Sequence, residues 1–243
     1  MKKLQKIYSG KAKTLYQTDN NDFVIMQFRD DATAFNAKKH AQFANKGAIN
    51  NQFSAFIMEK LKAANIPVHF EKMLGYDESL VKHLMMVPLE CVVRNIAAGS
   101  ICKRLGIEEG KELNPPVFEF FLKKDSLDDP MINESHIITF KWATETDIAR
   151  MKSLAFQVNE ILKPLFFNVG ILLVDYKLEF GRFHGELVLG DEFTPDGCRL
   201  WDVKTKTVFD KDRFRRDLGD LLTGYREVAK RLGLKLVEHP AMT

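Results

Sequence analysis

The chain has 243 residues, 45% of them hydrophobic and 28% charged, which is ordinary for a soluble globular protein with a full core. This length allows one large domain or two modest ones. A net charge of only +3 argues against a dedicated nucleic-acid-binding protein. No apolar run reaches the roughly 18 residues that span a bilayer, and residues 1–6 lack the apolar segment of a signal peptide.

Cysteine and histidine residues form no pattern that indicates a disulfide framework, a metal site or a catalytic triad. The three cysteines lack metal-ligand spacing: Cys91, Cys102 and Cys198. The six histidines are assigned no catalytic role: His40, His69, His83, His136, His184 and His239. The cysteine usage indicates a reducing compartment, so we expect a cytoplasmic protein that binds neither membranes nor nucleic acid.

Three short antiparallel strands are predicted at the start of the chain, at residues 4–8, 12–17 and 23–28. The turn between the first two contains Gly10 and Lys11, and Lys11 and Lys13 share one face. Glycine lets a ligand approach the backbone closely, and two ammonium groups on one face suit successive phosphates. A basic turn in water is the alternative, and the longer spacing of a Walker A motif is absent.

A helix and two strands are predicted after the polar, irregular residues 30–45. Apolar residues recur at helical spacing from Ile49 to Leu61, which indicates an amphipathic helix. Strands are predicted at residues 68–74 and 80–86.

Val87-Pro88 breaks this pattern, and we interpret it as a hinge between lobes of residues 1–86 and 87–243. Four apolar residues near this hinge either sandwich a purine or belong to the ordinary core: Met26, Val81, Leu84 and Met86.

A further strand at residues 89–96 leads into a segment of small residues. Ser100 is predicted to cap a helix at residues 101–105, whose N-terminal N–H groups could bind a phosphate. Arg94 could add a bidentate clamp. The alternative is an ordinary strand-to-helix turn.

The next elements are a strand at residues 119–124, a polar loop at residues 125–135 and a long helix that ends near Pro164. The apolar stripes of this helix and of a C-terminal helix at residues 214–232 belong to the core.

Residues 171–181 open with four aliphatic residues and then alternate strictly between charged and apolar ones. Asp175, Lys177 and Glu179 therefore share one face of a strand, at intervals of about 7 Å. A half-solvated hairpin is the alternative. The apolar residues 169–174 favour a strand covered on both sides, where carboxylates are costly unless they are paired or bound to a metal.

A turn at residues 181–182 and a second strand at residues 183–189 follow, and a short strand is predicted at residues 199–202. The connecting segment adds three carboxylates: Asp191, Glu192 and Asp196. Two converging carboxylates with a lysine between them could hold Mg²⁺ and a phosphorylated ligand.

Four segments together resemble the SAICAR synthetase family, in order and over nearly the whole chain. They are residues 10–13 (Gly-Lys-Ala-Lys), 94–100 (Arg-Asn-Ile-Ala-Ala-Gly-Ser), 175–181 (Asp-Tyr-Lys-Leu-Glu-Phe-Gly) and 190–202 (Gly-Asp-Glu-Phe-Thr-Pro-Asp-Gly-Cys-Arg-Leu-Trp-Asp). Two departures are Ser9, where an acidic residue is frequent, and residues 33–36 (Thr-Ala-Phe-Asn), which resemble a Ser-x-Phe-Asp element. No segment resembles the carboxylase domain fused to this enzyme in animals, so we expect the monofunctional, bacterial type.

The resemblance implies ATP-dependent joining of L-aspartate to the carboxylate of carboxyaminoimidazole ribonucleotide, with release of ADP and phosphate in purine biosynthesis. It implies an α+β fold of two lobes, with an antiparallel N-terminal sheet and a nucleotide cleft like that of ATP-grasp enzymes or kinases. The lobe of residues 1–86 would bind ATP, and the lobe of residues 87–243 would bind the substrate and Mg²⁺. Such enzymes are commonly homodimers or larger homo-oligomers.

The resemblance also implies roles for individual residues. ATP would contact Gly10, Lys11, Ala12, Lys13, Met26, Val81, Lys82, Leu84, Met86, Lys123 and Glu179, with the backbone of residues 82–84 against adenine. The metal ligands would be Glu179 and Asp191. The ribonucleotide and aspartate would contact Arg94, Ser100, Asp175, Lys177, Asp196 and Arg199, of which Asp175 and Lys177 would be catalytic.

Two other functions are considered. A small-molecule kinase would need a catalytic aspartate in a His-Arg-Asp-like loop, which is missing here. A non-catalytic nucleotide- or RNA-binding module would carry an aromatic and basic patch, and the acidic cluster of residues 175–196 opposes it.

Overall fold

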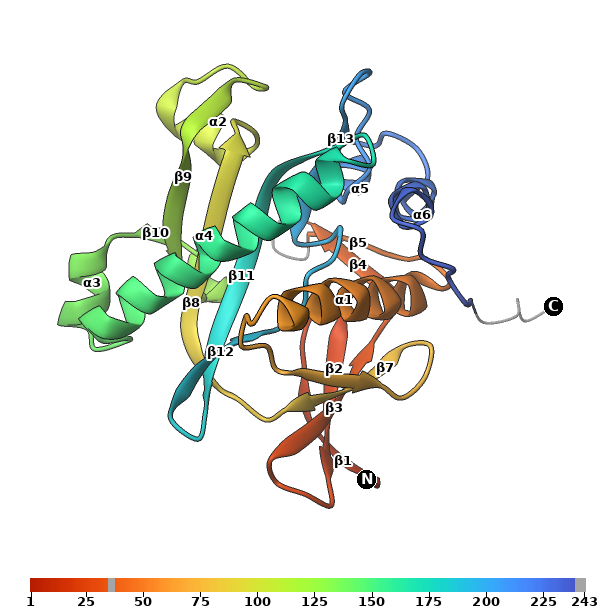
Figure 1. Ribbon diagram of the computed structural model, residues 1–243, viewed down its shortest axis with the longest axis vertical. Helices are drawn as coiled ribbons and strands as arrows, with labels where there is room; N and C mark the ends of the chain where they lie inside the picture. Colours follow the sequence, from red (N-terminus) through yellow and green to blue (C-terminus); the bar gives the residue numbers. More distant parts are fainter. Residues whose placement is uncertain (35–37, 239–243) are drawn as a thin grey trace.

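Two antiparallel sheets, each packed against one long helix, form the body of the protein in the computed structural model, which describes residues 1–34 and 38–238 (Figure 1). This arrangement confirms the predicted α+β fold class with an antiparallel N-terminal sheet. Two residues of the predicted Thr-Ala-Phe-Asn element, and His239, lie outside the described residues. None of the helices within the described ranges is long and apolar enough to cross a membrane.

The N-terminal sheet has the strand order β1-β2-β3-β7-β6 and packs against α1. Its elements are β1 (Lys3–Ser9), β2 (Lys13–Thr18), β3 (Phe23–Phe28), β6 (Phe70–Met73), β7 (Glu78–Lys82) and α1 (Lys46–Ala63). The first three strands and the helix are as predicted. The strand predicted at residues 80–86 is instead divided between the end of β7 and the start of β8.

The start of α1 is fixed against β3 by one glycine and one carboxylate. A side chain at Gly47 would overlap the backbone carbonyl of Phe28, so only glycine permits this approach. The carboxylate of Asp30 accepts hydrogen bonds from the backbone N–H of Gly47 (2.9 Å) and of Asn45 (3.2 Å). Asp30 thereby satisfies N–H groups at a helix terminus that lack helical partners.

The second sheet has the order β10-β9-β8-β11-β12, and β13 also pairs with β11. Its elements are β8 (Met85–Ile96), β9 (Glu112–Leu122), β10 (Met131–Ile132), β11 (Ile171–Phe183), β12 (Glu186–Gly190), β13 (Cys198–Asp202) and the covering helix α4 (Glu145–Phe167). The strand β11 is central, because it pairs with β8 on one side and with β12 and β13 on the other.

The two faces of β11 have different environments. Tyr176, Leu178 and Phe180 are buried in the main hydrophobic core, and the Tyr176 hydroxyl donates a hydrogen bond to the carbonyl of Ala155 on α4 (2.7 Å). Because side chains alternate along a strand, the predicted charged row lies on the face turned away from α4.

The remaining elements are β4 (Asp31–Ala34), β5 (Lys39–Gln42), α2 (Ser100–Leu105), a 3₁₀ helix (Asp125–Leu127), α3 (Glu134–Thr139), α5 (Asp212–Arg215) and α6 (Leu221–Arg231). Residues 30–45, predicted to be irregular, thus contain the β4–β5 hairpin. The predicted loop of residues 125–135 contains the 3₁₀ helix and β10. The helix α6 packs against α1, so the end of the chain contacts its N-terminal part.

The predicted pattern break at Val87-Pro88 is wrong, because β8 runs through both residues. The pairing of β8 with β11 shifts register between Glu179 and Gly181, opposite this segment. Such a bulge tolerates a proline without an N–H donor. The Pro88 carbonyl still accepts a hydrogen bond from the Lys123 backbone N–H (3.0 Å).

Two predicted helix ends are also wrong. The helix α4 continues past Pro164 to Phe167, since a proline in the last turn removes only one backbone donor. The predicted C-terminal helix is divided into α5 and α6 by a turn in which Asp217 (φ 53°) and Gly219 (φ 91°) are left-handed, and Asp220 caps α6.

The predicted hairpin turn at residues 181–182 lies three residues too early, because β11 extends to Phe183. The turn is formed by His184 (φ 49°) and Gly185 (φ 88°). Two successive positive φ angles suit the right-handed twist of a two-residue hairpin.

Candidate functional site

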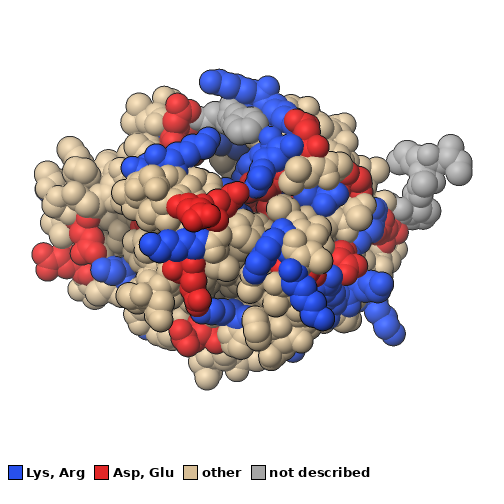
Figure 2. Space-filling view, turned by 90° about the horizontal axis from the view of Figure 1, so that it is seen from above, with Lys and Arg blue, Asp and Glu red and all other residues tan. Residues whose placement is uncertain are grey.

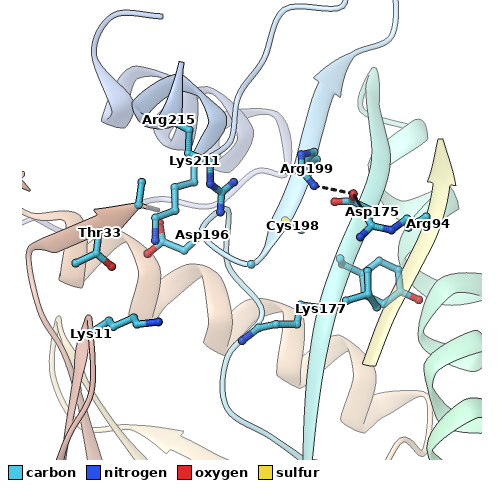
Figure 3. A pocket seen from close by; sticks show the side chains of 14 residues that line it. Lys11, Thr33, Arg94, Asp175, Lys177, Asp196, Cys198, Arg199, Lys211 and Arg215 are labelled. Carbon is cyan, nitrogen blue, oxygen red and sulfur yellow. Dashed lines mark hydrogen bonds and ion pairs between the residues drawn. The ribbon is translucent and has the colours of Figure 1, made fainter. Parts of the chain in front are cut away.

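A cavity of about 330 Å³ opens beside the charged face of β11, between that strand, β4 and α5 (Figure 3). Its charged lining residues are Lys11, Arg94, Asp175, Lys177, Asp196, Arg199, Lys211 and Arg215. Six of these are cationic and two anionic, so the cavity suits anionic ligands. From above, lysine and arginine side chains surround a hollow in the molecular surface, with carboxylates between them (Figure 2).

Asp175 is bound by two arginines from the neighbouring strands. In the sheet register it stands opposite Arg94 on β8 and Arg199 on β13. One oxygen, Oδ2, accepts a hydrogen bond from Nη1 of each arginine at 2.8 Å. The sheet therefore brings together three predicted site residues that lie far apart in the sequence.

This group is the centre of a chain of alternating charges that sequence reasoning missed. The chain is Arg104–Glu119–Arg94–Asp175–Arg199–Asp212–Arg215, with successive N–O distances of 2.5, 2.8, 2.8, 2.8, 2.8 and 2.6 Å. Burial opposes the charge on Arg199, yet Asp175 and Asp212 raise its pKa above the usual value. Removing one member of a buried ion pair costs about 3–5 kcal/mol, so the buried carboxylates of Glu119 and Asp175 hold Arg94 in place.

The segment before α2 packs directly onto this network. The N-cap of α2 is Gly99 (φ 65°), and a side chain there would overlap the guanidinium of Arg199. The prediction that Ser100 caps the helix is wrong, because Ser100 is its first residue. The Ser100 hydroxyl instead accepts a hydrogen bond from Nη2 of Arg94 (3.2 Å).

Glu179 lies at the other end of the charged row and is 1% exposed. Its Oε1 accepts a hydrogen bond from Nζ of Lys177 (2.6 Å), and its Oε2 pairs with Lys123. Lys177 also pairs with Glu90 (2.8 Å), which stands opposite Glu179 on β8. Burial opposes the charge on Lys177, but Glu179 and Glu90 raise its pKa well above the usual value.

Glu90 was not predicted, although Glu90 and Arg94 are four residues apart on a strand and therefore share a face. Burial raises the pKa of Glu90, and the nearby Lys177 partly offsets this effect.

A second carboxylate group lies at the end of β12. Asp191 (φ 56°) pairs with Lys13 of β2, and Glu192 lies 3.4 Å from the same ammonium. Burial opposes the charge on Asp191, but Lys13 and the neighbouring lysines Lys177 and Lys123 lower its pKa. Burial raises the pKa of Glu192, whose Oε2 is buried without a hydrogen-bond partner among the described residues.

The turn of residues 10–13, from β1 into β2, is held by Arg29, which the sequence reading also missed. Its guanidinium donates hydrogen bonds to the carbonyls of Gly10 (2.7 Å), Lys11 (3.1 Å) and Lys13 (2.8 Å). This contact positions the backbone on both sides of Ala12. The Lys11 ammonium pairs with Asp125 (2.8 Å) and is more exposed than that of Lys13.

The predicted purine contacts have different environments. Met26 and Val81 are buried in one small apolar cluster. Met86 is exposed, and Leu84 and Met86 pack over Gly181 and Gly190, where added side chains would collide with Leu84.

Two backbone N–H groups of the segment predicted to contact adenine already donate hydrogen bonds within the protein. The N–H groups of Lys82 and His83 donate to the carbonyls of His69 and Asp22, both at 2.8 Å.

Asp196 anchors two helices to the wall of the cavity. Its carboxylate accepts hydrogen bonds from Lys46 and Asn50 of α1 and from the Tyr225 hydroxyl of α6. Burial opposes its charge, but Lys46 and Lys211 lower its pKa. Its contact with substrate stays a prediction.

No group of three or more His, Cys, Asp or Glu residues with the arrangement of a metal site occurs within residues 1–34 and 38–238. The site carboxylates Glu179 and Asp191 are paired with lysines instead.

Comparisons with known proteins agree with this geometry. The family model described as SAICAR synthetase matches residues 6–232. The phosphoribosylaminoimidazole-succinocarboxamide synthase of Alcanivorax borkumensis is 62% identical over 234 residues, which are 96% of this chain and 98% of the relative. The crystal structure of the synthase of that name from Ehrlichia chaffeensis has a TM-score of 0.93 and 47% identity, covering 96% of this chain and 100% of that one. A SAICAR synthetase (Type-2) in complex with ADP has a TM-score of 0.92 and 45% identity, with the same coverage.

Proposed function

The chain belongs to the SAICAR synthetase family, and from this premise we propose that it is an ATP-dependent carbon–nitrogen ligase of purine biosynthesis. It joins L-aspartate to the carboxylate of carboxyaminoimidazole ribonucleotide and releases SAICAR, ADP and phosphate. The observation that best supports this function is the row of Asp175, Lys177 and Glu179 beside a cationic cavity. A kinase or a non-catalytic binding module is not favoured.

The chemistry requires activation of a carboxylate, which is a poor electrophile. The γ-phosphoryl group of ATP is transferred to a carboxylate oxygen, which gives an acyl phosphate and ADP. The aspartate amine then attacks the carbonyl carbon, phosphate leaves with that oxygen, and the amine loses a proton. Phosphoryl transfer depends mainly on positioning and on stabilisation of charge. Lys177, held between Glu90 and Glu179, supplies a fixed cation for both steps.

For the ribonucleotide, we assign its phosphate to Arg94, Ser100 and Arg199, and its imidazole carboxylate to the region of Lys177. Each arginine donates only some of its five N–H groups to carboxylates. These hydrogen bonds fix the guanidinium, and its remaining N–H groups can bind the ligand. Asp175 orients both arginines through one oxygen and lines the cavity.

For ATP, we assign the phosphates to Lys11, Lys13 and Lys123 and to the turn at Gly10 and Ala12. The purine would lie near Met26, Val81, Lys82, Leu84 and Met86. The convergence of Lys13 and Lys123 on the carboxylates of Asp191 and Glu179 supports this assignment. These ammonium groups would turn to the phosphates when ATP binds.

Mg²⁺ fits the carboxylates of Glu179 and Asp191, because it prefers one or two carboxylates together with phosphate oxygens. The buried, unpartnered oxygen of Glu192 beside Asp191 supports this fit. When bound, the ion would neutralise negative charge on the phosphates. Glu179 and Asp191 would hold it, and Lys13 and Lys123 would then be available to ATP.

We propose residues 1–86 as the ATP-binding lobe and residues 87–243 as the substrate- and metal-binding lobe. The first sheet ends at Lys82 and the second begins at Met85, which supports a division within a few residues of this boundary. From the resemblance we also propose a cytoplasmic homodimer or larger homo-oligomer.

The test replaces aspartate with hydroxylamine in the wild-type reaction. We expect ribonucleotide-dependent ADP release and formation of a hydroxamate, because hydroxylamine traps an acyl phosphate. With ¹⁸O in the imidazole carboxylate, label is expected in the released phosphate during normal turnover. Phosphate without this label would exclude the acyl phosphate.

Lys177→Ala is expected to suppress both signals together while ATP binding, measured by calorimetry, is largely retained. The exposed Lys163 provides a matched control, and Lys163→Ala should change neither signal.

A further inference from the structure

Asp210 is a buried carboxylate that lies between β13 and α5 and that the proposed chemistry does not use. Its exposed fraction is 0%. Its Oδ2 accepts a hydrogen bond from the backbone N–H of Leu200 on β13 (2.8 Å), and its Oδ1 accepts one from the backbone N–H of Asp212 on α5 (2.8 Å). It forms no ion pair with a residue that the structure describes. One carboxyl group therefore ties the strand to the helix.

Both hydrogen-bonding partners of Asp210 adjoin the proposed phosphate site. Leu200 directly follows Arg199, and the Asp212 carboxylate accepts a hydrogen bond from Nε of Arg199 (2.8 Å). From β13, the Arg199 guanidinium reaches toward Asp175 (Figure 3). A displacement of Asp210 would thus move both the strand that carries Arg199 and the carboxylate that orients it.

The charged and titratable groups that face Asp210 come from three elements. They are Cys198 and Arg199 of β13, Asp212 of α5 and Tyr225 of α6. Arg199 is the only cation of this set. The next cations along the chain are directed elsewhere, because Lys211 lies near Asp196 and Arg213 donates to backbone carbonyls.

This environment makes Asp210 titrate near neutral pH. Burial and the nearby Asp212 raise the pKa of Asp210 to about 7, although the two backbone N–H donors and Arg199 oppose this change. Arg199 offsets only part of the charge, because it also pairs with Asp175 and Asp212. Above pH 7 the ionised carboxylate places an additional negative charge beside Arg199, which weakens the attraction of that arginine for an anion.

We propose that Asp210 is a positioning residue of the ribonucleotide site, whose carboxyl group joins β13 to α5 beside Arg199 and whose charge sets how strongly Arg199 binds the phosphate. This inference rests on the proposed function, and Asp210 acts in it through Arg199 without touching the substrate. A bound phosphate favours the neutral form of Asp210, so binding of the ribonucleotide takes up a proton. By linkage, the affinity for the ribonucleotide falls as the pH rises through 7.

The experiment titrates carboxyaminoimidazole ribonucleotide into wild type and variants by calorimetry between pH 6 and 9. Two buffers of different ionisation enthalpy are used at each pH, so that the number of protons taken up is measured. At pH 7.5 the ligand phosphate is almost fully dianionic, since its second pKa is about 6, and net uptake must come from the protein. For wild type we expect uptake of about 0.5 protons per site at pH 7.5, and a Kd about 5-fold higher at pH 8.5 than at pH 6.5.

Asp210→Asn removes the ionisable group and leaves one oxygen for two N–H donors. We expect the proton uptake at pH 7.5 to disappear and the change in Kd between pH 6.5 and 8.5 to fall below about 2-fold. At pH 6.5, KM for the ribonucleotide should rise about 3- to 10-fold with little change in KM for ATP, because Arg199 is less well fixed.

Asp217→Asn is the matched control, and it should keep the wild-type proton uptake and pH dependence. Asp217 follows α5, its side chain is 84% exposed, and its left-handed backbone (φ 53°) suits asparagine.

Unchanged proton uptake in a folded Asp210→Asn variant would overturn the proposal, while product formation from ATP, ribonucleotide and aspartate would leave the proposed function intact. A wild-type protein that forms no product from these substrates would instead overturn the proposed function, and this inference with it.

If Asp210→Asn is unfolded by circular dichroism, the wild-type protein decides. Its proton uptake should be largest near pH 7.5 and should be lost at pH 9, where Asp210 is ionised in the free and in the bound state. Absence of uptake at pH 7.5, or uptake that persists at pH 9, would overturn the assignment.

Discussion

The two ends of the site differ in how their charges are balanced. At the end formed by Glu179 and Asp191, lysines from β2, β9–β10 and β11 neutralise the carboxylates directly. At the end formed by α5, Lys211 has no such partner within the described ranges. A ligand that binds at the first end must replace ion pairs that already exist between lysines and carboxylates. An anion that binds at the second end supplies a negative charge opposite Lys211. We therefore expect substitutions at the first end to affect turnover and substitutions at the second to affect affinity.

The largest effect is expected at the carboxylate end. Glu179→Gln should lower turnover at least about 100-fold, since even residues that only contact metal ligands contribute 10- to 100-fold. A neutral amide is a poorer ligand for Mg²⁺ and also leaves Lys177 and Lys123 without their shared partner. The measurement is kcat at saturating and at limiting Mg²⁺.

The control for this substitution is Glu186→Gln at the exposed start of β12, which should retain wild-type kcat. Near-normal activity of Glu179→Gln at limiting Mg²⁺ would contradict the metal assignment.

An intermediate effect is expected at Arg94, which pairs with Asp175 and Glu119 in the charge network. Arg94→Lys keeps the charge but loses the fork that contacts Glu119, Asp175 and Ser100. We expect KM for the ribonucleotide to rise about 10- to 100-fold, with a much smaller change for ATP. Steady-state kinetics with each substrate varied in turn checks this, with exposed Arg150→Lys as control. Equal increases for both substrates would make Arg94 a structural residue.

The smallest effect is expected at His69, a buried histidine near Asp191. Burial lowers the pKa of His69 to about 4, partly offset by Asp191. The unfolded state then binds more protons between pH 4 and 6.5, so stability present above pH 6.5 is lost as pH falls toward 4. This dependence corresponds to about 1–2 kcal/mol between pH 7.5 and 5.

His69→Gln should flatten this part of the dependence, measured as the free energy of unfolding in urea at the two pH values. His83→Gln, at an exposed position, should leave it unchanged. The same slope in His69→Gln and wild type would show that another group is responsible.

Much of the fold could be predicted from local patterns. The strand at Phe23–Phe28 has the predicted bounds, and the apolar stripe from Ile49 to Leu61 lies in α1. Errors occur where tertiary contacts override a local signal. Pro88 reads as a break, yet the register shift of β8 against β11 accommodates it. Gly181 reads as a turn, yet it makes room inside β11 for Leu84.

The candidate site was predictable where its residues share a strand. Asp175, Lys177 and Glu179 follow from a period of two, and their face is the one that lines or adjoins the cavity. Glu119 and Asp212 were missed because they act through arginines from distant segments. The assigned roles of the site residues remain predictions.

The sequence alone determined which residues alternate, which stretches are apolar enough to be buried and which family the motifs resemble. It determined the charged face of β11, because side-chain direction along a strand depends only on the local period. Only the tertiary structure decided which charges meet that face. Lys13 reaches Asp191 across 178 positions of sequence, and Lys123 reaches Glu179 across 56. Such pairs depend on sheet register and on how the two sheets are placed against each other, which no local pattern specifies.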